Sequence, residues 1–492
     1  MSHSGQRVAV IGGGITGLAA AHRLRELDPS LHVTLFEASS RLGGVLETRR
    51  EHGCLIERSA DMFTTRDPWA LDLCRRLGIA DQLINTNLAN RQAYVVHRGR
   101  LQAVPEGFTL MSPARILPVL RTPLLSWCGK LRLAGEYFTP RRRETSDESL
   151  QQFAVRRFGR ETYERIIQPL IGGIYTADPT RLSMQATMKQ FVDLEREYGS
   201  CIRGMRSKNK AAAANAQPSA ARGESGARYG MFVAPRDGFS SLVEALVRRL
   251  PADCVQLNAS VAKITRVAGS SSSSSSTTAG RWSVQLHGAE ATECSFDGVI
   301  LAAPAPHAAK LVTEFDQGLT DLLSRIEYAG AAVVVAGYPR QAITRPINGF
   351  GFVVPLVERR RILAGSLASV KFAGRAPDDL VLTRTFLGGA CQPELLNWTD
   401  TELATAAREE LAELLGITQP PSFMEVVRWD GKMPQYHVGH LQLVEQIEER
   451  ERHWPGLALA GNAYRGVGIP FCIRSGEQAA ERLLAQKTVA DT

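Results

Sequence analysis

The sequence lacks the cysteine spacing of a metal site or of a disulfide framework. Its eight cysteines are scattered over 492 residues, and no two of them form a Cys-x-x-Cys pair. Zinc sites and small secreted domains both depend on closely spaced cysteines, so we expect neither a metal site nor disulfides. The thiols are interpreted as reduced packing residues of a cytoplasmic protein.

Long apolar runs are also missing. No stretch reaches the ~18 consecutive uncharged apolar residues that a membrane-spanning helix needs. The N-terminus has no secretory apolar segment, because residues 8–11 run directly into Gly12. We therefore expect a soluble or surface-attached protein without a transmembrane helix.

A strong excess of one charge is absent as well. The 58 basic and 50 acidic side chains give a formal net charge of +8, which is mild for this length, so no nucleic-acid partner is expected. Apolar residues make up 44% and charged residues 22%, as in ordinary globular proteins. Because a single core stops growing at roughly 250 to 300 residues, two or more units must share the chain.

The clearest motif present is Gly-x-Gly-x-x-Gly at residues 12–17, directly after an apolar strand and at the start of an Ala/Leu-rich helix. Gly12 permits the tight turn, Gly14 lets the backbone approach a pyrophosphate, and Gly17 allows close helix packing. The helix N-terminus offers unpaired N–H groups to the phosphates. This context favours a dinucleotide site over a merely structural glycine turn.

A second predicted strand, over residues 32–37, ends at Glu37, twenty residues after Gly17. A carboxylate at this place accepts hydrogen bonds from both ribose hydroxyls and repels a 2′-phosphate, which argues against NADP. The first sixty residues are thus predicted to be a βαβ unit that binds a dinucleotide.

Two further patterns narrow the cofactor. Residues 37–44 extend the motif to Glu-x3-Arg-x-Gly-Gly, and near the C-terminus Gly461-Asn462 and residues 466–470 precede an Ala-rich helix. Both patterns resemble the FAD-dependent family of amine oxidases, desaturases and porphyrinogen oxidases. The resemblance implies FAD as cofactor and an α/β fold whose Rossmann-type, p-hydroxybenzoate hydroxylase-like FAD domain is assembled from both ends of the chain.

Over essentially its whole length the chain resembles the oxygen-dependent protoporphyrinogen oxidases and coproporphyrinogen III oxidases of this family. The local matches are residues 59–62, 90–91, 169–179, 349–355, 385–389 and 429–440. The resemblance implies an oxidoreductase that converts protoporphyrinogen IX to protoporphyrin IX, or coproporphyrinogen III to coproporphyrin III, in haem biosynthesis. FAD would accept the electrons, and O2 would reoxidise it to give H2O2. The choice between the two substrates stays open.

A porphyrinogen site needs an apolar slot, a positive handle for the propionates and a bound flavin. By resemblance, Arg91 pairs with a propionate, and Gly173 brings backbone polar groups to the ring nitrogens. The slot would be lined by Phe350, Val353, Leu367 and Phe386. No general base is predicted, because flavin N5 accepts the hydride and no side chain in a matched position is suited to take the proton.

The resemblance also assigns contacts with FAD. Trp429 would lie over the flavin, and the last helix would point its N-terminus at the ring. The predicted FAD contacts are Gly12, Gly13, Gly14, Ile15, Thr16, Gly17, Glu37, Ala38, Arg41, Gly43, Gly44, Val45, Ser59, Ala60, Asp61, Met62, Val261, Trp429, Gly461, Val467, Gly468 and Ile469. Arg41 is expected to pair with a phosphate or with the region of Glu37.

The expected division of the chain follows from these motifs. Residues 5–90, 231–305 and 440–488 form a discontinuous FAD-binding domain, 91–202 a mostly helical membrane-facing subdomain, 203–230 a flexible loop, and 306–439 a mixed-sheet substrate domain. The serine run 270–276 is expected to be the flexible tip of a hairpin.

Residues 116–135 interleave Leu, Pro and Trp127 with few charges and are followed by the basic run 141–143. This composition suits peripheral attachment to the inner face of the cell membrane, although a helical core beside a solvated charge run is an equal alternative. The resemblance leaves a homodimer and a ferrochelatase as candidate partners.

Several alternatives stay open. A flavin amine oxidase or carotenoid desaturase would share the fold, but Tyr464-Arg465-Gly466 makes an aromatic cage doubtful. A non-catalytic flavin-binding partner protein is a further alternative. Without the resemblance, the slot residues would be ordinary core residues, Arg91 a solvated charge and Gly173 a turn glycine. His437 and His440 are too few for a metal site and are interpreted as packing residues.

Overall fold

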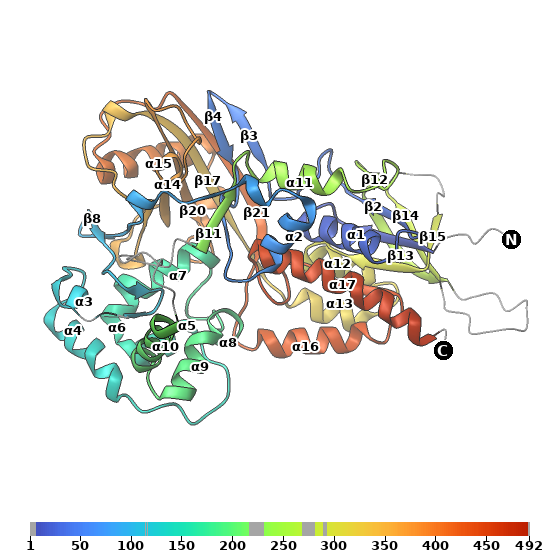
Figure 1. Cartoon of the computed structure of the whole chain (residues 1–492), viewed down its shortest axis with the longest axis horizontal. Helices are drawn as coiled ribbons and strands as arrows, with labels where there is room; N and C mark the ends of the chain where they lie inside the picture. The colour runs from blue at the N-terminus through green and yellow to red at the C-terminus, as the bar shows by residue number, and fades with distance from the viewer. Residues whose placement is uncertain are drawn as a thin grey trace, which may run out of the picture.

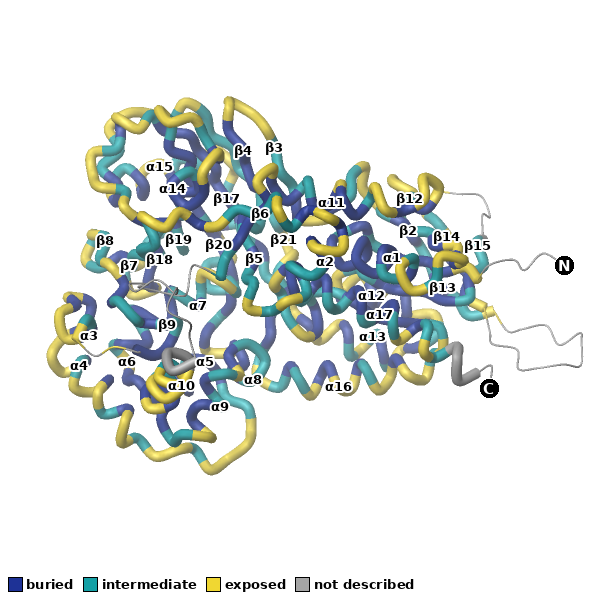
Figure 2. The backbone as a smooth tube through the Cα atoms, viewed as in Figure 1, coloured by how far each residue is buried: buried dark blue, intermediate teal, exposed yellow. Residues whose placement is uncertain are grey.

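The computed structural model describes residues 6–113, 115, 117–215, 231–267, 281–288 and 293–490. Two large sheets, several small ones and a group of helices make up the described part of the molecule, and the buried positions follow the sheets and the inner helix faces (Figures 1 and 2). The predicted α/β fold with a nucleotide-binding sheet and a second, mixed sheet is confirmed.

The first sheet, here the parallel sheet, has five parallel strands in the order β12-β2-β1-β16-β22. All four residues of β16 and all three of β22 are buried, as expected for a sheet covered on both faces. The strands are β1 (Arg7–Ile11), β2 (His32–Phe36), β12 (Val255–Gln256), β16 (Gly298–Leu301) and β22 (Leu457–Leu459). Each of the three stretches assigned to the discontinuous domain thus contributes strands to this sheet.

Two helices from opposite ends of the chain cover one face of the parallel sheet. They are α1 (Ile15–Leu27) and α17 (Ile469–Ala490). A Cβ on Gly476 would lie 2.1 Å from the carbonyl oxygen of Thr16, so glycine lets the two backbones touch. The first βαβ unit and the C-terminal helix therefore form one core.

The other face of the parallel sheet carries α12 (Ala305–Val312), α13 (Gln317–Ser324) and α16 (His440–Glu451).

Strands β13 (Val261–Val267) and β14 (Arg281–Leu286) pair antiparallel, which confirms the predicted hairpin, while its serine run lies outside the described residues. The remaining elements of this half are β3 (Thr48–Glu51), β4 (Cys54–Glu57), β5 (Phe63–Thr64), α2 (Trp69–Leu77), β6 (Leu83–Asn85), β11 (Phe232–Pro235), α11 (Phe239–Val247) and β15 (Glu293–Phe296).

The second sheet, here the mixed sheet, has seven strands in the order β21-β17-β20-β19-β18-β7-β8. They are β7 (Ala93–His97), β8 (Arg100–Ala103), β17 (Tyr328–Pro339), β18 (Gly351–Val353), β19 (Ala364–Leu367), β20 (Leu380–Gly388) and β21 (Phe423–Pro434). One face packs on α15 (Asp400–Leu415), and the other packs on β4 and on α14 (Ala368–Lys371).

The hairpin of β7 and β8 joins the mixed sheet because β7 pairs in parallel with β18. Strands β7 and β8, which lie in the stretch 91–202 predicted to be a mostly helical subdomain, therefore belong to the mixed sheet. Local sequence predicted the hairpin, but its partner strand lies more than 250 residues further along the chain.

The remaining helices form a separate group with its own apolar core, here the helical unit (lower left in Figure 1). At its centre Arg157 and Glu136 are fully buried and paired.

Residues 203–215 are helical, so the expected flexible loop over 203–230 is wrong in this part, and 216–230 lie outside the described residues. The unit contains β9 (Phe108–Thr109), β10 (Ser112–Pro113), α3 (Leu117–Arg121), α4 (Trp127–Ala134), α5 (Leu150–Phe158), α6 (Arg160–Thr162), α7 (Gln168–Tyr175), α8 (Met184–Thr187), α9 (Lys189–Tyr198) and α10 (Cys201–Asn215).

Among the described helices, none combines the length and the apolar character that crossing a bilayer requires.

Burial of Glu451, at the end of α16, makes the stability of the fold depend on pH. Burial raises the pKa of Glu451 to about 7, although Arg482, 3.3 Å away, acts in the opposite direction. Because the folded-state pKa exceeds that of the unfolded chain, this carboxyl stabilises the fold at low pH and loses that contribution as pH rises through 7.

The unfolding free energy of the wild type is expected to fall between pH 5 and pH 8. We predict that it falls less in Glu451→Gln, by about 3 kcal/mol. Urea unfolding at several pH values measures this change. Glu449→Gln, an exposed position on the same helix, is the matched control and should leave the pH dependence as in the wild type. An unchanged pH dependence in Glu451→Gln would contradict the prediction.

Candidate active site

The glycine motif forms the turn between β1 and α1. Gly12 has φ +110°, a conformation that favours glycine, and its N–H donates to the carbonyl of Phe36 at 2.8 Å. A Cβ on Gly17 would lie 1.9 Å from the carbonyl oxygen of Gly12. Both glycines are therefore required by the turn itself, before any ligand is considered.

Gly14 differs from its neighbours because a Cβ there would meet no protein atom within 4 Å. The open space lies at the N-terminus of α1, where N–H groups have no helical partner. On one side it is closed by Gly43, whose N–H donates to the carbonyl of Gly13 at 2.8 Å. An open, N–H-lined cradle of this kind fits a pyrophosphate.

Glu37 is held at the carboxyl end of β2. Its Oε2 accepts from the N–H of Gly13 at 2.7 Å, and its Oε1 accepts from the N–H of Ser39 at 2.8 Å. The backbone N–H of Ala259 donates to the carbonyl of Glu37 at 2.9 Å, which brings the start of β13, with Val261, beside this end of the site. The arrangement fits the ribose end of a dinucleotide.

Arg41 is tied to the loop that follows Glu37. Its guanidinium donates to the carbonyls of Leu42 and Leu46 at 3.2 and 3.1 Å, and it pairs with Glu47 at 3.3 Å. These contacts support the glycine loop from within, and the contact of Arg41 with a phosphate stays a prediction. Val45, beside this loop, keeps an exposed side chain that is available to a ligand.

The loop before α17 is the second glycine-rich part of the site. The hydroxyl of Tyr436 donates to the carbonyl of Asn462 at 2.5 Å and accepts from the N–H of Gly466 at 2.8 Å. Gly468 is exposed at the start of α17. Because α17 packs on α1, this second helix N-terminus opens close to the first, as a cofactor bound between the two motifs requires.

His440, which begins α16, supports the same loop. It stacks on Tyr436 with ring centroids 3.9 Å apart, and its Nε2 lies 2.9 Å from the carbonyl oxygen of Tyr464. Burial lowers the pKa of His440 to about 4. Within the described ranges no cluster of three His, Cys, Asp or Glu side chains is placed to hold a metal ion, and the contacts of His440 are those of a packing residue.

A turn of residues 58–62, here the 58–62 turn, connects β4 to β5 and is tied to the mixed sheet. Trp429 Nε1 donates to the carbonyl of Arg58 at 2.8 Å. Arg384, on β20, donates to the carbonyl of Ser59. The turn expected to contact the flavin therefore lies where the two halves of the molecule meet.

Asp61, in the same turn, is bound by two cations. Lys371 Nζ donates to its Oδ2 at 2.8 Å, and Arg384 Nη1 lies 3.1 Å from the same oxygen. Burial opposes ionisation of Asp61, but the two cations outweigh it and lower its pKa to about 2. Sequence reasoning missed Lys371 and Arg384, although a charged residue inside an apolar segment was a visible signal for both.

The structure places the predicted slot residues on different faces. Val353, Ala364 and Phe386 are successive cross-strand partners, so Val353 and Phe386 point to the same face of the mixed sheet. Leu367 pairs with Thr383, which is an odd number of residues from Phe386 on the same strand. The side chain of Leu367 therefore points to the opposite face of the sheet and packs in the core beneath α15. The structure does not bring Leu367 to the face that carries Phe386.

The backbone segments that contain Arg91 and Phe350 lie next to each other, just before β7 and β18. The N–H of Phe350 donates to the carbonyl of Gln92 at 2.9 Å, so the residue after Arg91 is bonded directly to Phe350. The pairing of β7 with β18 causes this approach.

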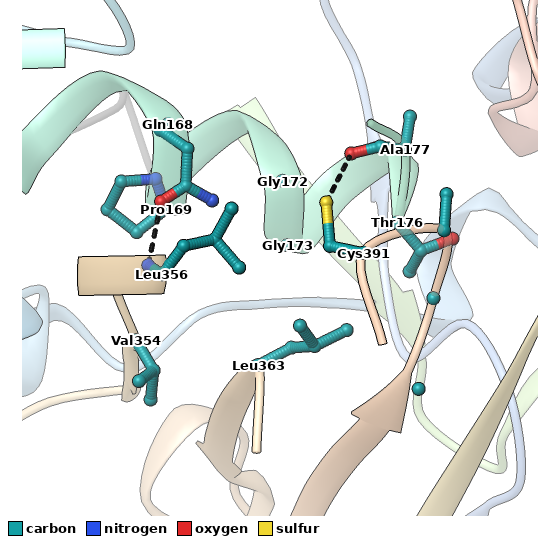
Figure 3. Close-up of a pocket in the computed structure, with 13 residues that line it drawn as sticks. Gln168, Pro169, Gly172, Gly173, Thr176, Ala177, Val354, Leu356, Leu363 and Cys391 are labelled. Carbon is teal, nitrogen blue, oxygen red and sulfur yellow. Dashed lines mark hydrogen bonds between the residues drawn. The ribbon is translucent and has the colours of Figure 1, made fainter. Parts of the chain in front are cut away.

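Gly173, on α7, lines a small pocket between that helix and the mixed sheet (Figure 3). A Cβ at Gly173 would lie 3.6 Å from Val353 Cγ1, so this glycine faces the predicted slot. The cavity is lined largely by apolar groups, among them Leu363, and by Cys391, whose thiol donates to the carbonyl of Ala177. Backbone at Gly173 is thus accessible beside an apolar surface.

A parallel nucleotide-binding sheet with two glycine-rich helix N-termini, joined to a mixed sheet that presents an apolar face, defines a two-domain dinucleotide-dependent oxidoreductase. The chain belongs to the family described as flavin containing amine oxidoreductase, which matches residues 15–484. The predicted resemblance and the predicted FAD cofactor are confirmed by this match.

Similar proteins cover nearly the whole chain. A coproporphyrinogen III oxidase of Bacillus subtilis (strain 168) is 32% identical, over 97% of this chain and 98% of its own. A protoporphyrinogen oxidase of Arabidopsis thaliana is 27% identical, over 98% and 94%. A crystal structure named as a protoporphyrinogen oxidase from Exiguobacterium sp. 255-15 is 30% identical, covers 99% of this chain and 100% of its own, and has a TM-score of 0.84.

We predict that Gly14→Ala leaves the FAD-free protein folded but weakens FAD binding at least tenfold, about 1.4 kcal/mol, because the new methyl group fills the open cradle. Gly17→Ala is the comparison, and it should destabilise the FAD-free protein by about 1 to 3 kcal/mol through overlap with Gly12. Thermal unfolding without FAD and flavin fluorescence titration separate the two effects. Wild-type FAD affinity in Gly14→Ala would contradict this assignment of the cradle.

Proposed function

We propose that this protein is an FAD-dependent porphyrinogen oxidase of haem biosynthesis that uses O2 as its electron acceptor. The observation that carries the proposal is the match to a coproporphyrinogen III oxidase over 97% of this chain and 98% of the relative, because it covers nearly the whole of both proteins. Coproporphyrinogen III is the first substrate to test, since relatives at 30 to 32% identity carry that name.

The chemistry assigns distinct tasks to the cofactor and to the protein. FAD, when bound, supplies the two-electron acceptor and passes the electrons to O2 as H2O2. The apolar side chains of Val353 and Phe386 exclude water and hold the macrocycle. The backbone at Gly173 meets the ring nitrogens, where a proton must leave. Asp61 is too weak a base, with a pKa of about 2, to take that proton at neutral pH.

Arg91 is proposed to bind a carboxylate arm of the substrate. The residue after it, Gln92, accepts a hydrogen bond from the N–H of Phe350, which brings the backbone of Arg91 close to another proposed slot residue. A guanidinium binds a carboxylate with two parallel hydrogen bonds and so orients the arm as well as attracting it. With four carboxylates, coproporphyrinogen offers more arms to such contacts than protoporphyrinogen, which has two.

The function is tested with FAD-loaded protein, protoporphyrinogen IX and coproporphyrinogen III under air. We expect porphyrin fluorescence and H2O2 to appear together with at least one substrate. Absence of both products from a protein that retains FAD would exclude the proposal. Anaerobic bleaching of the flavin by an amine or a polyene would instead favour one of the other oxidase classes.

Arg91→Ala is the site variant for the same assay. Loss of a charge-assisted pair worth about 1.5 to 3 kcal/mol should raise KM roughly 10- to 150-fold while FAD stays bound. Arg100→Ala, an exposed arginine on β8, is the matched control with an expected KM near the wild type. An unchanged KM in Arg91→Ala would remove Arg91 from the site.

Peripheral membrane attachment through the helical unit is also proposed. Phe138 is 83% exposed, Leu131 72% and Trp127 69%, and Lys130 lies over the Trp127 ring at 4.6 Å (α4 in Figures 1 and 2). Large apolar side chains flanked by basic groups suit an anionic lipid surface, with the rings in the acyl boundary and the ammonium among the headgroups.

Leu131→Asp and Phe138→Asp should each weaken binding to vesicles that contain anionic lipid by about tenfold or more, because an inserted apolar group becomes charged. Co-sedimentation measures the bound fraction. Leu257→Asp, in the opposite half of the molecule, serves as control. This attachment would be excluded if the wild type bound neutral and anionic vesicles equally well. It would also be excluded if neither Leu131→Asp nor Phe138→Asp changed the bound fraction.

A further inference from the structure

Three buried charged side chains meet between the parallel sheet and the mixed sheet. They are Asp61, Lys371 and Arg384, here the buried charge cluster. Both cations contact Oδ2 of Asp61, at 2.8 Å from Lys371 and 3.1 Å from Arg384. The exposed fractions of the three side chains are 12%, 8% and 2% respectively. Two cations and one ionised carboxylate leave the cluster with a net positive charge.

The neighbouring charges do not cancel this excess. Arg375 is buried next to the cluster, and its guanidinium donates to two neutral carbonyls, those of Pro235 and Arg236, at 2.9 and 2.8 Å. Burial raises the pKa of Glu57 to about 7, so this carboxyl is only partly ionised at neutral pH. A buried excess of charge is unfavourable unless an anionic group faces it.

Unsatisfied polar atoms around the cluster also indicate a polar ligand. Within the described part of the chain, Arg384 Nε and Ser59 Oγ are buried without a hydrogen-bond partner. The two residues are in contact, because Arg384 also donates to the carbonyl of Ser59. Buried polar groups in folded proteins are almost always paired, so two orphans in one place point to a partner that binds there.

The position of the cluster identifies that partner. Glu37 and the start of β13 mark the adenosine end of the dinucleotide site, and the cofactor then passes the open cradle at Gly14. Its other end must extend toward the mixed sheet, where Trp429 and Arg384 hold the 58–62 turn. In Figure 1, β20 and β21 lie near the middle of the molecule, below the hairpin of β3 and β4.

We propose that the buried charge cluster sets the reduction potential of the bound flavin. A net positive charge beside the flavin stabilises the negative charge that the flavin gains on reduction, and so favours the reduced form. Lys371 and Arg384 supply the charge, and Asp61 both moderates it and fixes the two cations to the turn. The inference deepens the proposed redox function but rests only on the FAD cofactor, not on the identity of the substrate.

The test is the midpoint potential of FAD-loaded variants, measured anaerobically against a reference dye without any porphyrinogen. Lys371→Met removes one positive charge and should lower the potential, with about a tenfold shift toward oxidised flavin, which is about 30 mV for a two-electron couple. Asp61→Asn removes the negative charge and should raise the potential by a similar amount.

The double variant Lys371→Met with Asp61→Asn is decisive, because it restores the net charge of the wild type. Its potential should return close to the wild-type value. If Lys371→Met alone does not fold, Asp61→Asn compared with the double variant still tests the same difference of one charge.

Matched controls separate local charge from total charge and from folding. Lys189→Met and Asp193→Asn change an exposed ion pair on α9 in the same two ways and should leave the potential unchanged. FAD titration and thermal unfolding of each variant measure any purely structural effect. A structural role would weaken FAD binding or stability in both single variants without moving their potentials in opposite directions.

Two results would overturn the inference. One is a pair of single variants whose potentials stay at the wild-type value or move in the same direction. The other is an unchanged potential with a raised KM for porphyrinogen in Lys371→Met, which would show that the cluster receives a substrate carboxylate. Loss of porphyrinogen turnover with the predicted potential shifts would leave the inference intact and bear on the substrate alone.

Discussion

The contact between Asp61 and the cations Lys371 and Arg384 is the interaction on which the geometry of the site depends. It connects a turn of the nucleotide-binding half to a strand and a helix of the mixed sheet, inside a region with little access to water. Charged groups remain buried only when their partners stay in place, so this contact fixes the distance between the two halves. The cofactor cradle and the slot face consequently meet at a defined separation.

The two halves contribute different properties to the site. The parallel sheet provides backbone groups: the turn at Gly12, the open position at Gly14 and the helix N-terminus at Ile469. Groups of this kind can bind phosphates through N–H donors, which need no particular side chain. The mixed sheet provides side chains, with Phe386 on one face and Leu367 on the other, because successive residues of a strand alternate in direction. In the proposed site, cofactor binding therefore depends on backbone conformation, and substrate binding depends on strand register.

Much of the cofactor half was predictable because its signals are local. The glycine motif, the strand before it and Glu37 lie within the first sixty residues, and the role of each follows from neighbours in the sequence. The contacts of Arg41 within its own loop were not predicted, because they depend on how the loop to Glu47 folds back. The helix at 203–215 was missed because its Ala-rich, basic composition suits a loop and a surface helix equally well.

The sequence by itself determined the class of fold, the cofactor and the resemblance to porphyrinogen oxidases, since these depend on short motifs and on their order along the chain. Only the tertiary structure decided that β7 joins the mixed sheet, that Leu367 faces away from Phe386, and that Asp61 receives two buried cations. Each of these depends on strand register or on contacts between residues up to about 300 positions apart. Such contacts form only when distant segments share one core, so no local pattern in the sequence encodes them.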